Sequence, residues 1–325
     1  MKRVFVTGAT GLVGYNIVQS LLKRSRRVRV LVRSTEKAKN LLPKGVEIVQ
    51  GDILDKEGLT NAMNGCAVVY HAAGLPEQWF RDSKIFYQIN VQGTQNIIDA
   101  VEKNGVHKLI YTSTIDVFKG NTGERFNESI VDLNPKGTAY ERSKQQAFQI
   151  ITEAAEKGLP VISVHPAGVY GPGPAGSPGV NNFISDLKNG KVPMLLPGGL
   201  PLVFSEDVGE GHVLAEEKGT IGQSYILSED YYTLPDLAAI ILCALRTNKK
   251  VPVVIPLPVV RLVSNLGEWI ANLTGKPPLI PKGQLHFMLW GALPDSTKAR
   301  VKLDWKAIPL PQGIRRTVGY LFPDS

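Results

Sequence analysis

The chain has 325 residues, 43% of them hydrophobic and 20% charged, with a formal net charge of +8 at pH 7. These proportions are ordinary for a globular protein, and the length allows one large domain or two unequal ones. The basic residues are scattered apart from a cluster at residues 23–27. We interpret that cluster as a solvated helix end rather than a contact for nucleic acid or a membrane, because cations suit that end of the helix dipole.

Cysteine usage and apolar runs bear on the compartment. Cys66 and Cys243 lie far apart and do not suggest a disulfide framework, so we expect a reducing environment. The first predicted strand begins at residue 2, which leaves no room for a signal peptide. No run reaches the ~18 apolar residues that a membrane-spanning helix needs. We therefore expect a cytoplasmic protein with no integral membrane segment and no nucleic-acid partner.

A glycine-rich turn follows the apolar run at residues 4–6 and precedes a segment with helical spacing of apolar residues, 15–22. Gly8 permits the tight turn, Gly11 lets the backbone approach a pyrophosphate, and Gly14 lets the helix pack on the strand. Free N–H groups and the dipole at the helix start favour phosphate. Glycines also make ordinary turns, but this strand–turn–helix context predicts dinucleotide binding. The residues assigned to it are Thr7, Gly8, Thr10, Gly11, Leu12, Val13 and Gly14.

The second predicted strand, Val28–Val32, ends at Arg33. An NAD-binding chain usually carries an acid ~20 residues past the glycine turn, where it binds a ribose hydroxyl. Here Arg33 takes that place, with Lys37 after it, and an Arg fork suits a 2′-phosphate. The alternative is that both are surface charges on a loop. We predict NADP as the cofactor, with NAD as the alternative.

Strands and helices continue to alternate through the first half, which predicts a doubly wound parallel sheet. A third strand at residues 46–50 is followed by Asp52 and Ile53. Asp52 is a turn or cap residue, an acceptor for adenine, or both.

The fourth strand, residues 67–71, leads into the small residues Ala72, Ala73 and Gly74, which let a cofactor pass close to the backbone. We interpret His71 as a packed histidine, because no Ser or Cys nucleophile motif accompanies it.

Hydroxyl groups stand at the carboxyl end of the next strand, residues 108–111, where ligands bind in an open α/β sheet. They belong to Thr112, Ser113 and Thr114. A long helix predicted over residues 83–104 carries Asn90, and a second over residues 138–157 carries Tyr140 and Lys144. Spacing of four puts that phenol and ammonium on one helix face. A lone pair of this kind is usually surface, but its order after the glycine turn and the hydroxyls favours a catalytic role.

The second half loses this alternation. A turn-rich loop at residues 171–179 is expected at the rim of a substrate cleft. An amphipathic helix at residues 259–273 has an apolar face that we assign to the core rather than to a greasy pocket. The histidines show no metal-binding spacing, so we predict no metal. We expect a dinucleotide-binding domain over residues 1–168 and a smaller, mostly helical substrate-binding region over residues 169–325, with some segments returning to the sheet.

Together these motifs resemble the extended branch of the short-chain dehydrogenase/reductase superfamily, the NAD(P)-dependent epimerase/dehydratase family, whose fold is a Rossmann-type sheet. Within it, the chain is most similar to dihydroflavonol-reductase-like and 3β-hydroxysteroid-dehydrogenase-like members, and farnesol-dehydrogenase-like and hopanoid-associated epimerase-like sequences also look close. The match rests on residues 7–14, 51–52, 71–74, 90–94, 111–114, Tyr140 with Lys144, and residues 165–172, 206–212 and 295–299.

The resemblance implies a division of labour in the site. Tyr140 is the acid/base, and Lys144 lowers its pKa from ~10 and holds the ribose. Thr114 hydrogen-bonds the substrate oxygen, with Ser113 as helper. Asn90 holds a proton-relay water or caps a helix kink. Further cofactor contacts are implied at Ile53, Pro166 and Val169.

The activity implied is reduction of a ketone or aldehyde on a fairly apolar small molecule with NADP(H), or the reverse oxidation. Gly168 stands where sugar-nucleotide members carry an Asn that holds phosphates, which argues against a UDP-sugar. Two alternatives stay open, an NAD-dependent sugar-nucleotide epimerase or dehydratase and a non-enzymatic NADP-sensing or RNA-binding relative. A homodimer is an alternative to a monomer. Candidate substrate residues, though aromatics are core residues by default, are Trp79, Phe80, Phe118, Gly168 and Phe183.

Overall fold

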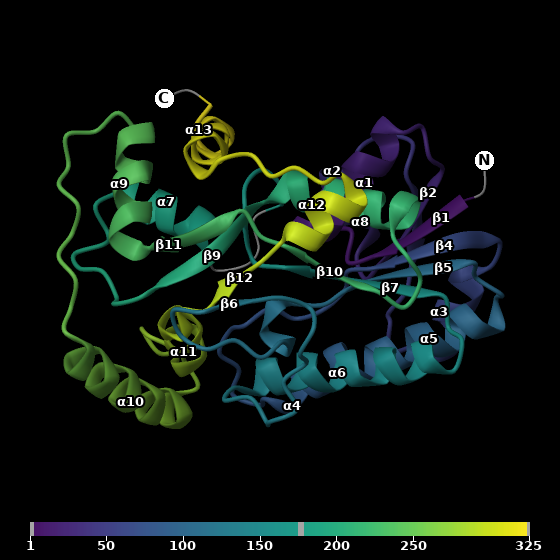
Figure 1. Ribbon diagram of the computed structural model, residues 1–325, viewed down its shortest axis with the longest axis horizontal. Coiled ribbons are helices and arrows are strands. Elements are labelled where there is room, and N and C mark those ends of the chain that lie inside the picture. The colour runs from purple at the N-terminus through teal and green to yellow at the C-terminus, as the bar shows by residue number, and fades with distance from the viewer. Residues whose placement is uncertain (1–2, 175–178, 324–325) are drawn as a thin grey trace.

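A seven-stranded sheet lies at the centre of the computed structural model, which describes residues 3–174 and 179–323 (Figure 1). Its strands are all parallel, in the order β10-β7-β5-β4-β1-β2-β3. This confirms the predicted α/β class and the Rossmann-type arrangement. The strands are β1 (Arg3–Thr7), β2 (Val28–Val32), β3 (Glu47–Gln50), β4 (Cys66–His71), β5 (Lys108–Thr112), β7 (Val161–Pro166) and β10 (Ser224–Leu227).

Helices cover both faces of this sheet (Figure 1). The central strands are mainly apolar and almost wholly buried, as expected for a parallel sheet covered on both sides. One face carries α1 (Leu12–Lys23), α2 (Thr35–Leu41), α8 (Ser205–Lys218) and α12 (Thr297–Leu303); the other carries α3 (Lys56–Met63), α5 (Gly93–Lys103) and α6 (Ala139–Glu156).

The register of the sheet aligns the ends of its central strands. Thr7 at the end of β1 lies opposite His71 of β4, and His71 lies opposite Tyr111 of β5. The segments that follow these strands therefore leave the sheet at one edge, beside the point where the strand order reverses. In such sheets this crevice is the ligand site.

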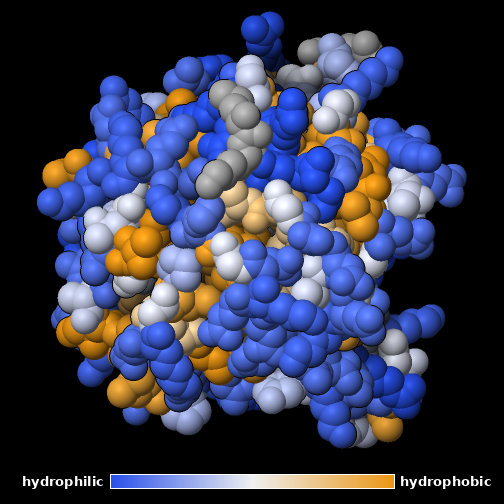
Figure 2. All heavy atoms as spheres, turned by 90° about the vertical axis from the view of Figure 1, so that its right-hand side faces the viewer, coloured by the Kyte–Doolittle hydropathy of each residue, from blue (hydrophilic) through white to orange (hydrophobic). Residues whose placement is uncertain are grey.

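The basic cluster at the end of α1 is tied to α8. Arg24 forms ion pairs with Glu210 and Glu217, and Arg26 pairs with Glu216. The cluster thus holds two packed helices together. The surface at this end of the molecule is mainly hydrophilic, with hydrophobic residues in separate patches (Figure 2).

A second layer of structure surrounds a separate hydrophobic core, built on residues such as Ile184, Leu202, Leu237, Ile241 and Ile314. Strand β10 returns to the main sheet between these segments, and the domain boundary at residue 168 remains a prediction. The elements are a three-stranded sheet of β8 (Gly168–Tyr170), β9 (Gly199–Phe204) and β11 (Asp230–Thr233), with α7 (Val180–Lys188), α9 (Leu234–Ala244) and α13 (Leu310–Leu321).

Two helices reach beyond this core at the lower left of Figure 1, α10 (Leu257–Thr274) and α11 (Lys282–Trp290). The expectation that the apolar face of α10 joins the core is wrong, because the helix buries Val260, Ser264 and Ala271 and exposes its large apolar side chains. No described helix is long and apolar enough to cross a membrane. Residue 2, and residues 175–178 of the expected rim loop, lie outside the described residues.

Candidate active site

The glycine turn between β1 and α1 is closely packed. Gly8 has φ +74°, and a Cβ there would lie 2.5 Å from the carbonyl group of Ala72. A Cβ on Gly14 would lie 2.2 Å from the carbonyl oxygen of Gly8, so helix and turn can approach this closely only with glycine. Gly11 is the N-cap of α1 and provides no side-chain acceptor, which leaves the N–H groups of the first turn for a phosphate. These features fit a bound dinucleotide.

Thr7 shapes this turn from within. Its side chain is fully buried, and its hydroxyl hydrogen-bonds Nδ1 of His71 at 2.8 Å and accepts from the N–H of Ala73 at 3.3 Å. The other ring nitrogen of His71 lies 3.2 Å from the hydroxyl of Thr94. Burial lowers the pKa of His71 to about 3. His71 is therefore a neutral packed histidine, as the sequence predicts, and the Thr7 hydroxyl is occupied by these internal bonds.

Arg33 lies at the end of β2 just before α2, whose N-terminus is capped by the Ser34 hydroxyl. Both Arg33 and Lys37 are exposed. Among the described residues the Arg33 guanidinium forms no hydrogen bond or ion pair, so it is available to a ligand in the adjoining crevice.

The segment after β3 is a turn rather than a helix cap. Asp52 accepts a hydrogen bond from the N–H of Leu54 at 2.9 Å, and the cap of α3 is Asp55. Ile53 is buried against Gly93 of α5. The turn residues Ala72 and Ala73 are half-buried at the end of β4 and Gly74 is exposed, while Pro166 is buried at the end of β7.

A capping box fixes where α6 begins. The Thr138 hydroxyl accepts from the N–H of Glu141, and the Glu141 carboxylate accepts from the N–H of Thr138. This reciprocal pair places Tyr140 in the first turn and Lys144 one turn later. Lys144 is 8% exposed, donates to the carbonyl oxygen of Thr112 at 3.0 Å, and lies over the ring of Tyr111.

Tyr140 and Thr114 come together at the end of β5. Burial and the Asp116 carboxylate raise the pKa of the Tyr140 phenol well above its usual value, while a hydrogen bond with Thr114 acts to lower it. Burial lowers the pKa of Lys144 to about 8, against the influence of Asp116. The ammonium faces the end of β5, and the acid groups rather than Lys144 dominate the charge around the phenol in this structure.

Asp116 is a site residue that the sequence reasoning missed. It is 5% exposed, and its Oδ2 accepts a hydrogen bond from the Thr114 hydroxyl at 2.8 Å. Burial and nearby Glu141 raise its pKa to about 6. Its place two residues after the strand-end hydroxyl was the available signal. Glu77, whose pKa burial raises to about 7, gave none because only the fold brings its loop to α6.

Asn90 connects two other segments of the site. It lies in a π-helical segment, η1 (Tyr87–Gln92), preceded by the single turn α4 (Lys84–Phe86). Its side chain accepts from the N–H of Leu75 at 2.8 Å and donates to the Ser143 hydroxyl at 2.9 Å. Asn90 thus holds the loop after β4 against α6. A bound water at Asn90 remains a prediction. Ser113, the predicted helper of Thr114, is buried at the end of β5.

The candidate substrate residues differ in how far they are buried. Phe118 is fully buried, with its ring against Phe148 and His165, so it is a core residue and has no exposed surface for a substrate. Trp79 and Phe80 are half-buried on the loop after β4, and Phe80 contacts Phe86, which contacts Tyr140.

Gly168 and Phe183 lie on the side of the second core. Phe183 is half-buried and packs against it. A Cβ on Gly168 would lie 2.9 Å from the carbonyl oxygen of Pro201, because β8 and β9 pair at this point. Val169 next to it is half-buried. The close approach of β9 at Gly168 leaves no room for a side chain at this position.

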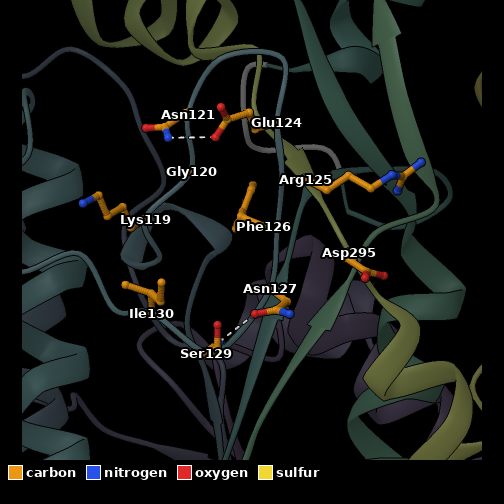
Figure 3. A pocket seen from close by; sticks show the side chains of 10 residues that line it. All are labelled: Lys119, Gly120, Asn121, Glu124, Arg125, Phe126, Asn127, Ser129, Ile130 and Asp295. Atoms are coloured by element: carbon orange, nitrogen blue, oxygen red, sulfur yellow. Dashed lines mark hydrogen bonds between the residues drawn. The ribbon is translucent and has the colours of Figure 1, made fainter.

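A separate hollow of about 430 Å³ lies beyond the end of β5 (Figure 3). It involves the loop around β6 (Arg125–Phe126), which pairs with β12 (Leu293–Pro294) and follows the short 3-10 helix η2 (Ile115–Val117). Polar side chains such as Asn121, Glu124 and Asn127 line it, and Tyr140 and Lys144 are not among its lining residues. We therefore do not assign it to the site.

Comparison with known proteins decides the family. The family model described as the NAD dependent epimerase/dehydratase family matches residues 4–228. The chain belongs to this family. A putative dihydroflavonol 4-reductase of Synechocystis sp. is 34% identical over 242 residues, 72% of this chain and 70% of that protein.

Other relatives in the family carry steroid names. Sterol demethylase protein B of Methylococcus capsulatus is 30% identical over 231 residues, 70% of each chain. A 3beta-hydroxysteroid-dehydrogenase/decarboxylase of Arabidopsis thaliana is 27% identical across 96% of this chain, which spans 61% of that longer protein. As a member of this family with relatives named as reductases and dehydrogenases, the chain is an NAD(P)-dependent oxidoreductase.

Solved structures agree with the fold. The crystal structure of gox2253 superposes with TM-score 0.86 at 29% identity, covering 99% of this chain and 98% of that one. UDP-glucose 4-epimerase from Thermotoga maritima superposes with TM-score 0.79 at 22% identity, covering 99% of both. At that identity the epimerase shows the shared fold alone.

Proposed function

We propose that the chain uses NADP(H) to reduce a ketone or aldehyde on a fairly apolar small molecule, or to oxidise the corresponding alcohol. The observation that carries the proposal is the meeting of Tyr140, Thr114 and Lys144 at the sheet edge where the glycine turn also lies. When bound, the nicotinamide supplies or accepts the hydride. The protein then has to bind the carbonyl oxygen and deliver a proton to it.

Tyr140 is the proposed proton donor in reduction. A new alkoxide takes the phenolic proton, and the alcohol returns it in oxidation. Thr114 binds the same substrate oxygen, since its hydroxyl already contacts the phenol. Because the Thr114 hydroxyl donates its hydrogen bond to Asp116 in this structure, its oxygen is left to accept a hydrogen bond from the phenol. Protonation of Asp116, or arrival of the substrate oxygen, would free the Thr114 hydroxyl to donate elsewhere.

Lys144 is proposed to hold the ribose and to support the phenolate. Its ammonium is anchored on the Thr112 carbonyl in the same crevice. A cation within ~4–6 Å of a phenol favours its ionised form. A bound oxidised nicotinamide would act in the same direction, and we propose that together they counter burial and the Asp116 carboxylate, which raise the pKa of Tyr140.

Two observations support the finer choices of cofactor and substrate. The free Arg33 guanidinium at the end of β2 suits a 2′-phosphate, which favours NADP. Relatives named for a dihydroflavonol and for sterols favour an apolar substrate. The closeness of Gly168 to Pro201 leaves no place for a phosphate-binding Asn.

The decisive experiment is Tyr140→Phe assayed against a panel of apolar ketones with NADPH. We expect kcat to fall at least ~10²-fold, the usual scale of acid–base catalysis, with NADPH binding unchanged by fluorescence titration. Tyr87→Phe, on the exposed side of the neighbouring helix, is the matched control and should retain full activity. Intact turnover by Tyr140→Phe would refute the proposal. Tightly retained NAD(H) in the purified protein would instead favour a sugar-nucleotide epimerase.

A further inference from the structure

The apolar side chains of α10 form one continuous stripe on its surface. They recur at the spacing of a helix face, and at ~100° per residue they span about a third of its circumference. Each is between 38% and 66% exposed. The stripe, as we call it, consists of Val259, Leu262, Val263, Leu266, Trp269, Ile270 and Leu273.

The helix is packed in the reverse of the usual sense. A surface helix ordinarily buries its apolar face and exposes polar residues. In α10 the face toward the protein carries Val260, Ser264 and Ala271, and Ser264 is fixed there by a hydrogen bond to the carbonyl of Ile280 at 2.9 Å. The stripe therefore faces outward, because the residues that α10 buries lie on the opposite face of the helix. Of the nineteen large hydrophobic residues exposed in the described chain, eleven lie between residues 251 and 279.

Basic residues precede and follow the stripe in the sequence, with little acid to balance them. Between residues 246 and 282 the sequence has six cations and one acid, and that acid, Glu268, is paired with Lys282. Arg81 lies beside Gly275 at the end of α10. Of the six cations, Arg261 lies on α10, Lys276 and Lys282 follow it, and Arg246, Lys249 and Lys250 follow α9, where Lys249 donates to the carbonyl of Lys188 at 2.7 Å.

We infer that α10 docks on an anionic lipid bilayer, lying in the interface with the stripe inserted among the acyl chains. Exposed large apolar residues on one helix face, a Trp among them, and flanking cations are the features of an interfacial helix. Anionic headgroups complement the unbalanced basic charge. A second copy of this chain fits less well, because a two-fold contact through the stripe would set like charges together.

The docked helix would sit close to the active site. Helix α11 packs on α10, and its His286 lies 3.2 Å from Glu141 at the start of α6. Gly283 of α11 adjoins Glu77. Delivery of an apolar substrate from the bilayer to this rim rests on the proposed function, whereas binding to the bilayer does not.

The test is co-sedimentation of the full chain with vesicles. We expect binding to vesicles of mixed phosphatidylcholine and phosphatidylglycerol, weakening with salt, and at least ~10-fold weaker binding to phosphatidylcholine alone. Leu262→Glu with Leu266→Glu should reduce binding to the mixed vesicles at least ~10-fold. The control, Leu133→Glu with Val301→Glu, replaces residues that are 88% and 70% exposed but lie outside the stripe, and should bind as the wild type does.

Light scattering without vesicles separates the competing occupant. A monomer that binds mixed vesicles supports the inference. The inference would be overturned in favour of a second copy if the protein does not bind vesicles and forms a dimer that Leu262→Glu with Leu266→Glu converts to monomer. Equal loss of binding in the control variant would also overturn it. Unchanged melting temperatures establish that each variant is folded, and no assay here depends on enzymatic turnover.

Discussion

Asp116→Asn tests the electrostatics around Tyr140 directly. The carboxylate accepts from Thr114 at 2.8 Å, and Thr114 also bonds the phenol. The Thr114 hydroxyl thus lies between the two groups, and we take the charge to be roughly 6 Å from the phenol oxygen, about two hydrogen-bond lengths. With an effective dielectric constant of about 20 to 40, that separation corresponds to ~1.4–2.8 kcal/mol, or about one to two pKa units.

The sign follows from the charge that is lost. A carboxylate opposes formation of the phenolate, so its replacement by a neutral amide should lower the pKa of Tyr140. Alcohol oxidation requires the phenolate, and the rising limb of its kcat/KM profile should move about one to two pH units toward acid. Since the pKa of Asp116 is raised to about 6, the two enzymes should differ above that pH and converge below it.

The assay is kcat/KM for oxidation, measured across pH in both enzymes. The control is Asp82→Asn, which neutralises an exposed acid just before α4. Thr114 keeps an acceptor in the Asn variant, so the hydrogen-bond geometry is retained while the charge is removed. A limb that stays in place or moves toward alkaline pH, with cofactor binding and melting temperature unchanged, would refute this account of the site.

Substitutions at Arg33, Lys144 and Gly14 test other parts of the site. Arg33→Ala should raise KM for NADPH ~10-fold or more and leave KM for NADH unchanged, whereas Arg27→Ala at the other end of β2 should alter neither in steady-state assays. Lys144→Met should abolish turnover yet match or raise the melting temperature near pH 7. Because burial lowers the lysine pKa to about 8, the wild type should gain ~1–3 kcal/mol between pH 8 and 10.5, where the unfolded chain binds the extra proton; a flat pH dependence in denaturant titrations would contradict it. Gly14→Ala should abolish cofactor binding, since its Cβ would lie 2.2 Å from a carbonyl oxygen, whereas Gly319→Ala, with open space around it, should be neutral or stabilise the helix by under ~1 kcal/mol, as thermal melts would show.

Local rules made the first half of the chain predictable. Apolar strands that alternate with helices specify a parallel sheet. A helix start such as the capping box at Thr138 depends on only four consecutive residues. The helix predicted over residues 138–157 is α6, Ala139–Glu156. Parallel register then brings the ends of β1, β4 and β5 together, so the glycine turn, the strand-end hydroxyls and the Tyr140 helix could be assigned to one edge.

The sequence therefore determined the fold class, the family and the segments that form the crevice, because each depends on patterns within a few residues of one another. Only the tertiary structure brought Glu77 to α6, set Asp116 behind Thr114 and buried Phe118 in the core. It also turned the apolar face of α10 outward, which periodicity cannot foretell. A repeat of apolar residues fixes which side chains share a face, whereas the direction of that face depends on what packs against the opposite one.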